Sequence, residues 1–309
     1  MIAPWLISVA IFKGLDFVSP QDNITAAERV PMPFIAMGII VILVAVAIFS
    51  IKLPVIVTEK GEKKSIFKYP HVVLGAIGIF AYVGAEVGNA GLLVNYLQGA
   101  VEGMTKEGAA TYAAIYWGGA MVGRFYGSFM FSDKTFSQKL TYLLPVLALA
   151  FVAGSFVTGS FVDGSFTFNW AIGATFTGAS LINFIIMVFG KGKAARSLAI
   201  FALVAALLDI SQIFVGGNVA LWTVISIGLF NSIMFPNIFS LAVKGLDKAE
   251  LAGASGLINA LIIGGAIIPP IMGSIADVTG EYKWVFIVPA ICYLYIFYYA
   301  VKGNTIRKA

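Results

Sequence analysis

The chain has 309 residues, of which 60% are apolar and 11% are charged, and its formal net charge is +5. Soluble domains carry about a quarter charged residues, so this composition excludes a water-soluble globular protein and indicates an integral membrane protein. The single cysteine, Cys292, excludes a disulfide framework. The basic residues are spread over loops, which excludes a nucleic-acid-binding face.

Apolar runs between charged breaks predict nine full membrane-spanning helices. A helical span needs about 20 apolar residues, and the alternating strands of a membrane barrel are absent, so the predicted fold is an all-α polytopic membrane protein. A tenth, partial segment at 2–12 has about half the length of a span and lacks the basic start and cleavage site of a signal peptide. We expect it to be the end of a helix whose beginning is missing. The nine full runs lie near residues 34–53, 71–99, 110–131, 140–160, 168–190, 197–217, 219–243, 252–275 and 284–301.

Loop charges predict the orientation of these segments. Ten segments would place both termini on the same side of the membrane. The loops on that side contain 15 lysines and arginines, the opposite loops contain four, and Arg124 inside a span completes the 20. Because basic loops stay in the cytoplasm, both termini are predicted to be cytoplasmic. The four residues on the opposite side are Lys13, Arg29, Lys106 and Lys283.

The longest polar stretch on the cytoplasmic side, residues 54–69, divides the chain. It is an ordinary solvated loop by composition, but its position after the second segment makes it the natural link between two helical bundles. We therefore expect residues 1–53 to be a remnant of an N-terminal bundle and residues 70–309 to form a C-terminal bundle.

A polar stripe lies in the span 71–99. Tyr82, Glu86 and Asn89 fall within about 80° of one another on a helix, whereas Asn95 points to the opposite side if the helix is straight. Glycines at 84, 88 and 91 would allow a local break that turns Asn95 inward. The stripe predicts a substrate cavity; alternatively, Gly84 and Gly88 form a close-packing face and Glu86 bonds a neighbouring helix.

Two further ionisable residues lie inside spans. Arg124 follows glycines at 119 and 123 in a face suited to tight helix packing, and it lies about 12 Å from the cytoplasmic end. It is expected to bond exposed carbonyls or an acid on another helix, as a cytoplasmic gate contact or as a structural contact. Asp209 is expected to pack against another helix.

Prolines beside polar residues predict kinks in two spans. Pro236 frees the carbonyl of Ser232, next to Asn231, which would form a corner able to bind a hydroxyl. Pro269 and its neighbour Pro270 predict a second bend, with Asn259 about three turns earlier. Proline kinks alone indicate only shape, but kinks beside asparagines favour a path for a polar solute.

Motifs typical of membrane enzymes and of nucleotide-driven pumps, such as HExxH, GxSxG and the P-loop, do not occur in the sequence. The chain is therefore not expected to be an enzyme. What remains is facilitated or ion-coupled movement of a small solute, or a membrane scaffold or sensor without transport.

Several motifs resemble the fucose permease and glucose/galactose transporter family of the major facilitator superfamily. VGAEV at 83–87 and VNYL at 94–97 are similar to its seventh helix, and WGGAMVGRF at 117–125 is similar to its eighth. Ile2-Ala3-Pro4 resembles part of the fifth helix. The C-terminal part carries GLFNSIMFP at 228–236, GGAIIP at 264–269 and PAICYLY at 289–295.

This resemblance implies two six-helix bundles, a mid-membrane substrate site between them, and proton-coupled uptake by alternating access. The first two segments would be the family's helices five and six. The spans at about 139–192 would be an inserted hairpin, giving 14 spans in a complete protein. The four missing helices hold the acids thought to couple protons in fucose permease, so this chain should not transport alone, and an upstream in-frame extension would supply them. Asn89 departs from the apolar residue expected at its position.

Sequence and resemblance together predict the C-terminal part of an importer of a hexose or deoxyhexose in a bacterial inner membrane. Its partners would be the sugar and the lipid bilayer, without nucleic acid, and it would use no cofactor besides a coupling proton. A facilitator for another polar solute such as a nucleoside, or a non-transporting remnant or sensor, remains an alternative. The candidate substrate-binding residues are Tyr82, Glu86, Asn89, Asn95, Asn231 and Asn259, and the candidate gating or structural residues are Arg124, Pro236 and Pro269.

Overall fold

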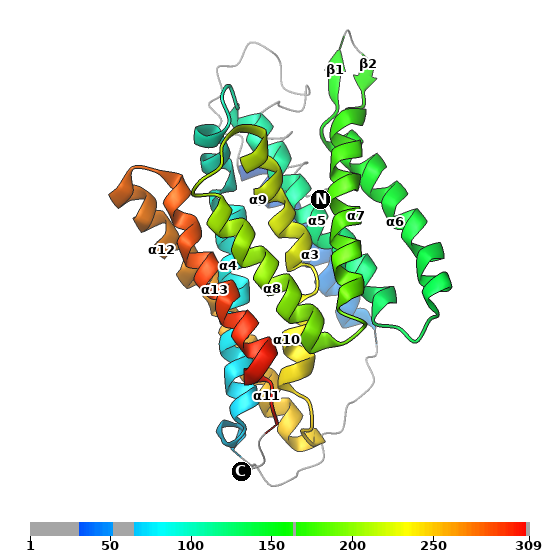
Figure 1. Cartoon of the computed structure of the whole chain (residues 1–309), viewed down its shortest axis with the longest axis vertical. Coiled ribbons are helices and arrows are strands. Elements are labelled where there is room, and N and C mark those ends of the chain that lie inside the picture. Colours follow the sequence, from blue (N-terminus) through cyan, green and yellow to red (C-terminus); the bar gives the residue numbers. More distant parts are fainter. Residues whose placement is uncertain (1–30, 52–64, 163–164, 307–309) are drawn as a thin grey trace.

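The computed structural model describes residues 31–51, 65–162 and 165–306, which are almost entirely helical (Figure 1). Each of the nine full runs expected from the sequence contains a helix among the described residues, while the segment at 2–12 lies outside them. The helices are α3 (Pro31–Ser50), α4 (Pro70–Ala100), α5 (Lys106–Met130), α6 (Phe136–Val157), α7 (Trp170–Phe189), α8 (Ala194–Ser211), α9 (Gly217–Asn231), α10 (Met234–Ala242), α11 (Lys248–Ala260), α12 (Gly264–Thr279) and α13 (Ile287–Tyr298), with short turns η2 (Ile66–Lys68), η3 (Leu261–Ile263), η4 (Tyr282–Phe286) and η5 (Tyr299–Gly303).

Seven helical segments among the described residues are long and apolar enough to cross a membrane. Helices α9 and α10 together form one of these segments, Gly217–Ala242. Most of α11, with η3 and α12, forms another, Glu250–Thr279. Helix α5 has 25 residues, but its glycines, tyrosines and Arg124 make it less apolar. The described apolar part of α3 covers only Ile35–Ser50. The fold is thus a multi-pass helical membrane protein.

Local sequence signals define where several helices begin. The Thr135 side chain accepts a hydrogen bond from the Gln138 amide, and the Gln138 side chain bonds back, forming a capping box at the start of α6. Asp247 and Glu250 form the same arrangement at α11. Gly280, with φ of 72°, ends α12 in the left-handed conformation that glycine adopts without strain.

Helix α4 lies inside the bundle and packs against α5, α10, α12 and α13. Glycines allow the closest approaches. A Cβ added at Gly84 would overlap Ile268 on α12, and one at Gly264 would overlap the Phe80 carbonyl. Gly123 likewise faces Ser232, so the predicted close-packing faces exist on both α4 and α5.

Helices α6 and α7 form a hairpin that packs beside the bundle, mainly along α5 (Figure 1). A two-stranded ladder, β1 (Ser160–Val162) and β2 (Ser165–Thr167), joins them and adds a small element that the all-α expectation lacked. The hairpin begins and ends at adjacent points, because a Cβ on Gly192 would lie 3.5 Å from the Met130 carbonyl. Its position beside an otherwise continuous bundle is compatible with the predicted insertion.

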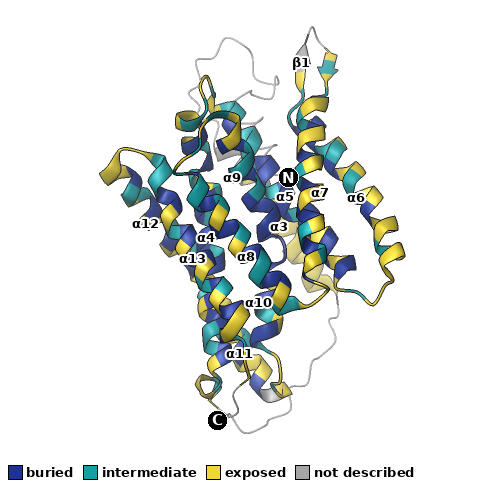
Figure 2. Cartoon of the chain, in the orientation of Figure 1, coloured by how far each residue is buried: buried dark blue, intermediate teal, exposed yellow. Residues whose placement is uncertain are grey.

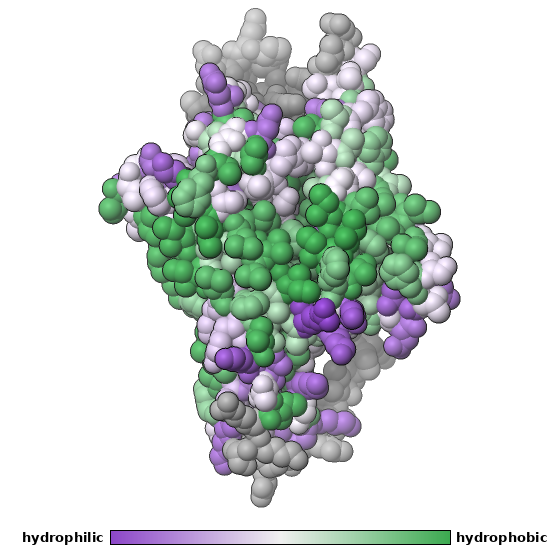
Figure 3. Space-filling view, in the orientation of Figure 1, coloured by the Kyte–Doolittle hydropathy of each residue, from purple (hydrophilic) through white to green (hydrophobic). Residues whose placement is uncertain are grey.

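The surface has the pattern of a membrane protein. Figure 3 shows a broad apolar band across the middle, with hydrophilic residues above and below it. In Figure 2 the outward faces of α6, α7 and α12 are largely exposed, whereas α4 and α9 contribute buried residues. Large aliphatic side chains such as Leu144, Ile182 and Ile291 are more than half exposed, which suits contact with lipid.

The two proline-containing spans are irregular in different ways. Residues Ser232 and Ile233 separate α9 from α10, three residues before Pro236, so this span is interrupted as expected. In the other span, α12 continues through Pro269 and Pro270, and the irregularity is the 3₁₀ turn η3 that precedes α12. Here the departure from α-helix lies before the prolines.

Candidate functional site

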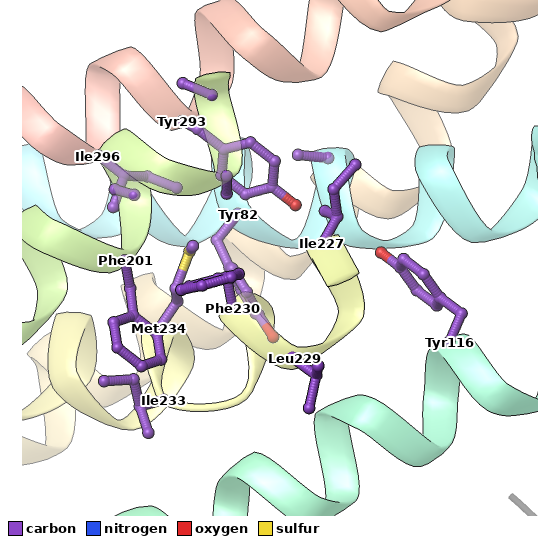
Figure 4. Packing of buried hydrophobic residues seen from close by; sticks show 14 of the residues in the cluster. Tyr82, Tyr116, Phe201, Ile227, Leu229, Phe230, Ile233, Met234, Tyr293 and Ile296 are labelled. Carbon is purple, nitrogen blue, oxygen red and sulfur yellow. The ribbon is translucent and has the colours of Figure 1, made fainter. Parts of the chain in front are cut away.

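Asn231, at the end of α9, is the centre of a buried hydrogen-bond cluster. Its side-chain Nδ2 donates to the Tyr116 hydroxyl at 2.8 Å, and its Oδ1 accepts from the Tyr293 hydroxyl at 2.6 Å. Its backbone carbonyl accepts from the Tyr82 hydroxyl at 3.1 Å. Figure 4 shows these three tyrosines reaching from α4, α5 and α13 toward α9. We call these four residues the tyrosine cluster.

The interruption before Pro236 explains this cluster. The last carbonyls of a helix lack partners within the helix, so the Asn231 carbonyl is free to accept a hydrogen bond from another helix. The Tyr82 hydroxyl donates this hydrogen bond. The sequence predicted a corner for a ligand hydroxyl at the carbonyl of Ser232 beside Asn231. The Asn231 side of this corner is occupied by hydroxyls of the protein, and Asn231 itself is fully buried.

A second buried contact joins α4 to α8. The Asn89 Nδ2 donates to Oδ1 of Asp209 at 3.1 Å, and both residues are fully buried. The remaining oxygens of the pair, Asn89 Oδ1 and Asp209 Oδ2, have no hydrogen-bond partner. Asp209 thus packs against another helix, as expected, through a residue of the predicted polar stripe.

Glu86 and Arg124 form an ion pair between α4 and α5, with Nη2 of Arg124 3.5 Å from Oε1 of Glu86. The Glu86 side chain is 10% exposed and the Arg124 side chain is 51% exposed. Arg124 therefore bonds an acid on a neighbouring helix, one of the two partners that its depth predicted. The ion pair lies at the edge of the bundle, with Glu86 nearly buried and Arg124 half exposed. This ion pair can either hold the two helices together or contact a polar solute.

The other two candidate asparagines are exposed. Helix α4 is continuous over Pro70–Ala100, so the local break that would turn Asn95 inward does not occur. Asn95 lies opposite the buried stripe and donates to the Tyr282 hydroxyl at 2.8 Å. Asn259 is exposed near the end of α11.

The predicted substrate-binding residues therefore fall into two groups. Tyr82, Asn89 and Asn231 are fully enclosed in the bundle, Glu86 lies at its edge, and the remaining asparagines are outside. Their roles in binding a substrate stay predictions. Among the described residues, no group of three or more histidine, cysteine, aspartate or glutamate side chains is placed to hold a metal ion.

Sequence reasoning did not single out Tyr116 and Tyr293, which complete the tyrosine cluster. Tyrosines in apolar spans are common, and nothing in their spacing distinguishes these two from lipid-facing ones. A signal was present in Asn231 itself: a buried amide needs both a donor and an acceptor partner. The residues that supply this donor and this acceptor lie on other helices, 62 and 115 positions from Asn231 in the sequence.

The chain is similar to known sugar transporters over most of its length. It is 36% identical over 304 residues to the glucose/galactose transporter of Brucella abortus, covering 95% of this chain and 59% of that protein. It is 27% identical over 300 residues to the L-fucose-proton symporter of Escherichia coli, covering 93% of this chain and 55% of that protein. No protein-family model matches the chain.

Its fold is also that of a solved transporter. A crystal structure of a major facilitator superfamily transporter in the outward conformation matches with a TM-score of 0.55 at 23% identity, over 97% of this chain and 65% of that one. The chain spans 55 to 59% of the length of the curated relatives reported above. The resemblance expected from the motifs is confirmed.

Proposed function

From its homology to bacterial sugar transporters and its major facilitator fold, we propose that this chain forms the second bundle of a secondary transporter in a bacterial inner membrane. The transporter imports a hexose or deoxyhexose by proton symport and alternating access. The observation that carries this proposal is the similarity to the glucose/galactose transporter, which extends over 95% of the chain.

The geometry supports a polar solute at the edge of the bundle. The half-exposed Arg124 guanidinium and the Glu86 carboxylate offer donors and acceptors that can engage sugar hydroxyls. The buried tyrosine cluster lies behind this pair, because the Tyr116 hydroxyl also bonds the Glu86 carbonyl at 3.2 Å. In this proposal Glu86 and Arg124 face the substrate, and Asn231 keeps their helices in place.

Uptake measurements test the proposal. The gene, with its upstream DNA, is expressed in a bacterial host that lacks its own hexose and fucose uptake, and accumulation of labelled glucose, galactose and fucose is measured. We expect accumulation of at least one sugar, abolished by a proton uncoupler. Uptake that stops at equal sugar concentrations on the two sides and is indifferent to the uncoupler would instead indicate a uniporter.

Two controls separate the alternatives. An excess of unlabelled nucleoside should leave sugar uptake unchanged, whereas strong competition would favour the facilitator for another polar solute. The purified 309-residue chain in liposomes is expected to show no proton-driven sugar uptake without a first bundle. Loss of all uptake in the host, with the protein present in the membrane, would support a non-transporting protein.

A further inference from the structure

The contact between Asn89 and Asp209 contains an imbalance of donors and acceptors. The pair has one hydrogen bond, from Nδ2 of Asn89 to Oδ1 of Asp209 at 3.1 Å. The other amide oxygen and the other carboxyl oxygen are both buried acceptors without a partner. Two acceptors cannot bond each other, and buried polar atoms are rarely left unpaired.

A single proton would give both unpaired oxygens a hydrogen bond. We infer that Asp209 is a proton-binding site inside the bundle, with the proton on Oδ2 and donated to Oδ1 of Asn89. A neutral carboxyl has one donor and one acceptor, as has the amide facing it, so the two groups form a ring of two hydrogen bonds. Reversing the amide of Asn89 leaves the same requirement, because its oxygen then faces Oδ1 of Asp209.

The surroundings favour a proton over another positive group. Among the described residues, no ion pair includes Asp209, and the ionisable side chains close enough to influence it electrostatically include Tyr116, Cys292 and Tyr293, none of them a cation. Two oxygen acceptors are too few for a hard metal cation such as calcium or magnesium, which takes six or more ligands. An ionised carboxylate here would be buried without a counter-ion, which is strongly unfavourable.

The proton would lie in a side-chain contact between two helices. Asn89 is on α4 and Asp209 is on α8, and both side chains are fully buried, so proton release to water requires a rearrangement that hydrates the carboxyl. On release the Oδ2–H bond breaks, the proton passes to water, and the carboxylate keeps the electron pair. Use of this step in transport rests on the proposed function, whereas the bound proton does not.

Infrared spectroscopy of the 309-residue chain in lipid bilayers at neutral pH tests this inference. We expect the difference spectrum between the wild type and Asp209→Asn to contain the carbonyl stretch of a protonated carboxylic acid, which shifts in heavy water. The isosteric asparagine can form the same two hydrogen bonds, so the variant should fold. The control Glu86→Gln should retain this band.

A second variant keeps the test decisive. In Asn89→Leu the acid loses its partner, so its band should move to higher frequency as its hydrogen bonds are lost. Absence of a band assignable to Asp209 in the wild type, with the carboxylate bands of an ionised acid in its place, would overturn the inference and indicate a bridging water. The measurement needs no sugar transport, so a positive band with failed uptake would reject only the proposed function.

Discussion

Several polar side chains inside this bundle have partners that match their chemistry. An unpaired ionisable group at mid-membrane costs about 2.5 to 3.5 kcal/mol on insertion scales, so Arg124 pairs with Glu86. Asn231 uses both ends of its amide and its carbonyl to hold three tyrosines from three other helices. These residues join the helices at fixed points and so restrict how they rotate.

Replacing Asn231 should destabilise the protein through Tyr293. In Asn231→Leu the Tyr293 hydroxyl loses its acceptor while it remains buried, which we expect to cost about 1 to 3 kcal/mol. The loss is measured as a lower unfolding temperature in detergent. The double variant Asn231→Leu/Tyr293→Phe should recover part of it, because both partners are then apolar. Equal stability of the wild type and the single variant would contradict the structural role.

The Tyr69 hydroxyl outside the membrane-spanning helix α4 should make stability depend on alkaline pH. Its hydrogen bond to Glu250 is the largest of the causes that raise the pKa of Tyr69, and it connects the starts of α4 and α11. A raised pKa means that the stabilisation is complete below about pH 10 and is lost as the pH rises through the folded-state value. Above about pH 10 the unfolding temperature should therefore fall further in the wild type than in Tyr69→Phe. The exposed Tyr298, changed to phenylalanine, is the control and should follow the wild type.

At the scale of helices, glycine and proline decide how the elements meet. Glycines on α4 and α5 remove the side chains that would otherwise separate these helices from α12 and α9. The interruption before Pro236 turns the end of α9 toward the other helices and frees the carbonyl that Tyr82 bonds. The same residue types therefore provide both the close packing and the polar cluster.

A single added methyl group tests the packing. In Gly123→Ala the new Cβ would overlap the side chain of Ser232, so we expect a loss of about 1 to 3 kcal/mol. Gly91 on α4 has no atom within 4 Å of an added Cβ, so Gly91→Ala should be neutral or slightly stabilising. The unfolding temperatures of the two variants, measured under the same conditions, test this difference in stability. A Gly123→Ala protein as stable as Gly91→Ala would show that α5 and α9 are not closely packed.

The α6–α7 hairpin should be separable from the bundle. Its main ties are to α5, including the bond from the Tyr126 hydroxyl to Ser180 Oγ at 3.1 Å, and its two ends lie beside each other. Replacing residues 132–191 by a short glycine-serine loop should leave a folded, monodisperse helical protein with a lower unfolding temperature. Circular dichroism and size-exclusion chromatography measure this. An aggregated product would show that the hairpin is part of the core, against the predicted insertion.

At the scale of the whole molecule, lipid replaces water as the main solvent. The apolar band in Figure 3 and the exposed aliphatic side chains of α6 and α7 would be unfavourable in water and are suited to a bilayer. Because lipid solvates apolar side chains, the bundle does not need to bury all of them. Close packing and polar contacts between helices hold it together instead.

The orientation in the membrane is a prediction at this scale. A green fluorescent protein fused to the C-terminus should fluoresce, and alkaline phosphatase fused there should be inactive, because the C-terminus is predicted to be cytoplasmic. Fusions placed after Gly280, in the loop before α13, should give the opposite result. Phosphatase activity at the C-terminus would contradict the predicted cytoplasmic location of that terminus.

Much of the fold could be predicted because the relevant signals are local. Hydropathy located a helix in each of the nine runs, and Pro236 marked an interruption. The exposure of Asn95 followed from the helical period, since it lies opposite Glu86 on a straight helix. The strands β1 and β2 are too short to leave a periodic pattern.

The sequence by itself determined that this protein is a multi-pass helical membrane protein, because span length and apolar content depend only on neighbouring residues. Only the tertiary structure decided that Asn231 holds three tyrosines, that Arg124 meets Glu86, and that Asn89 meets Asp209 across 120 positions. Such pairs depend on the rotation of each helix about its axis and on how closely glycines let two helices approach. These quantities arise from packing among all the helices, so no single segment encodes them.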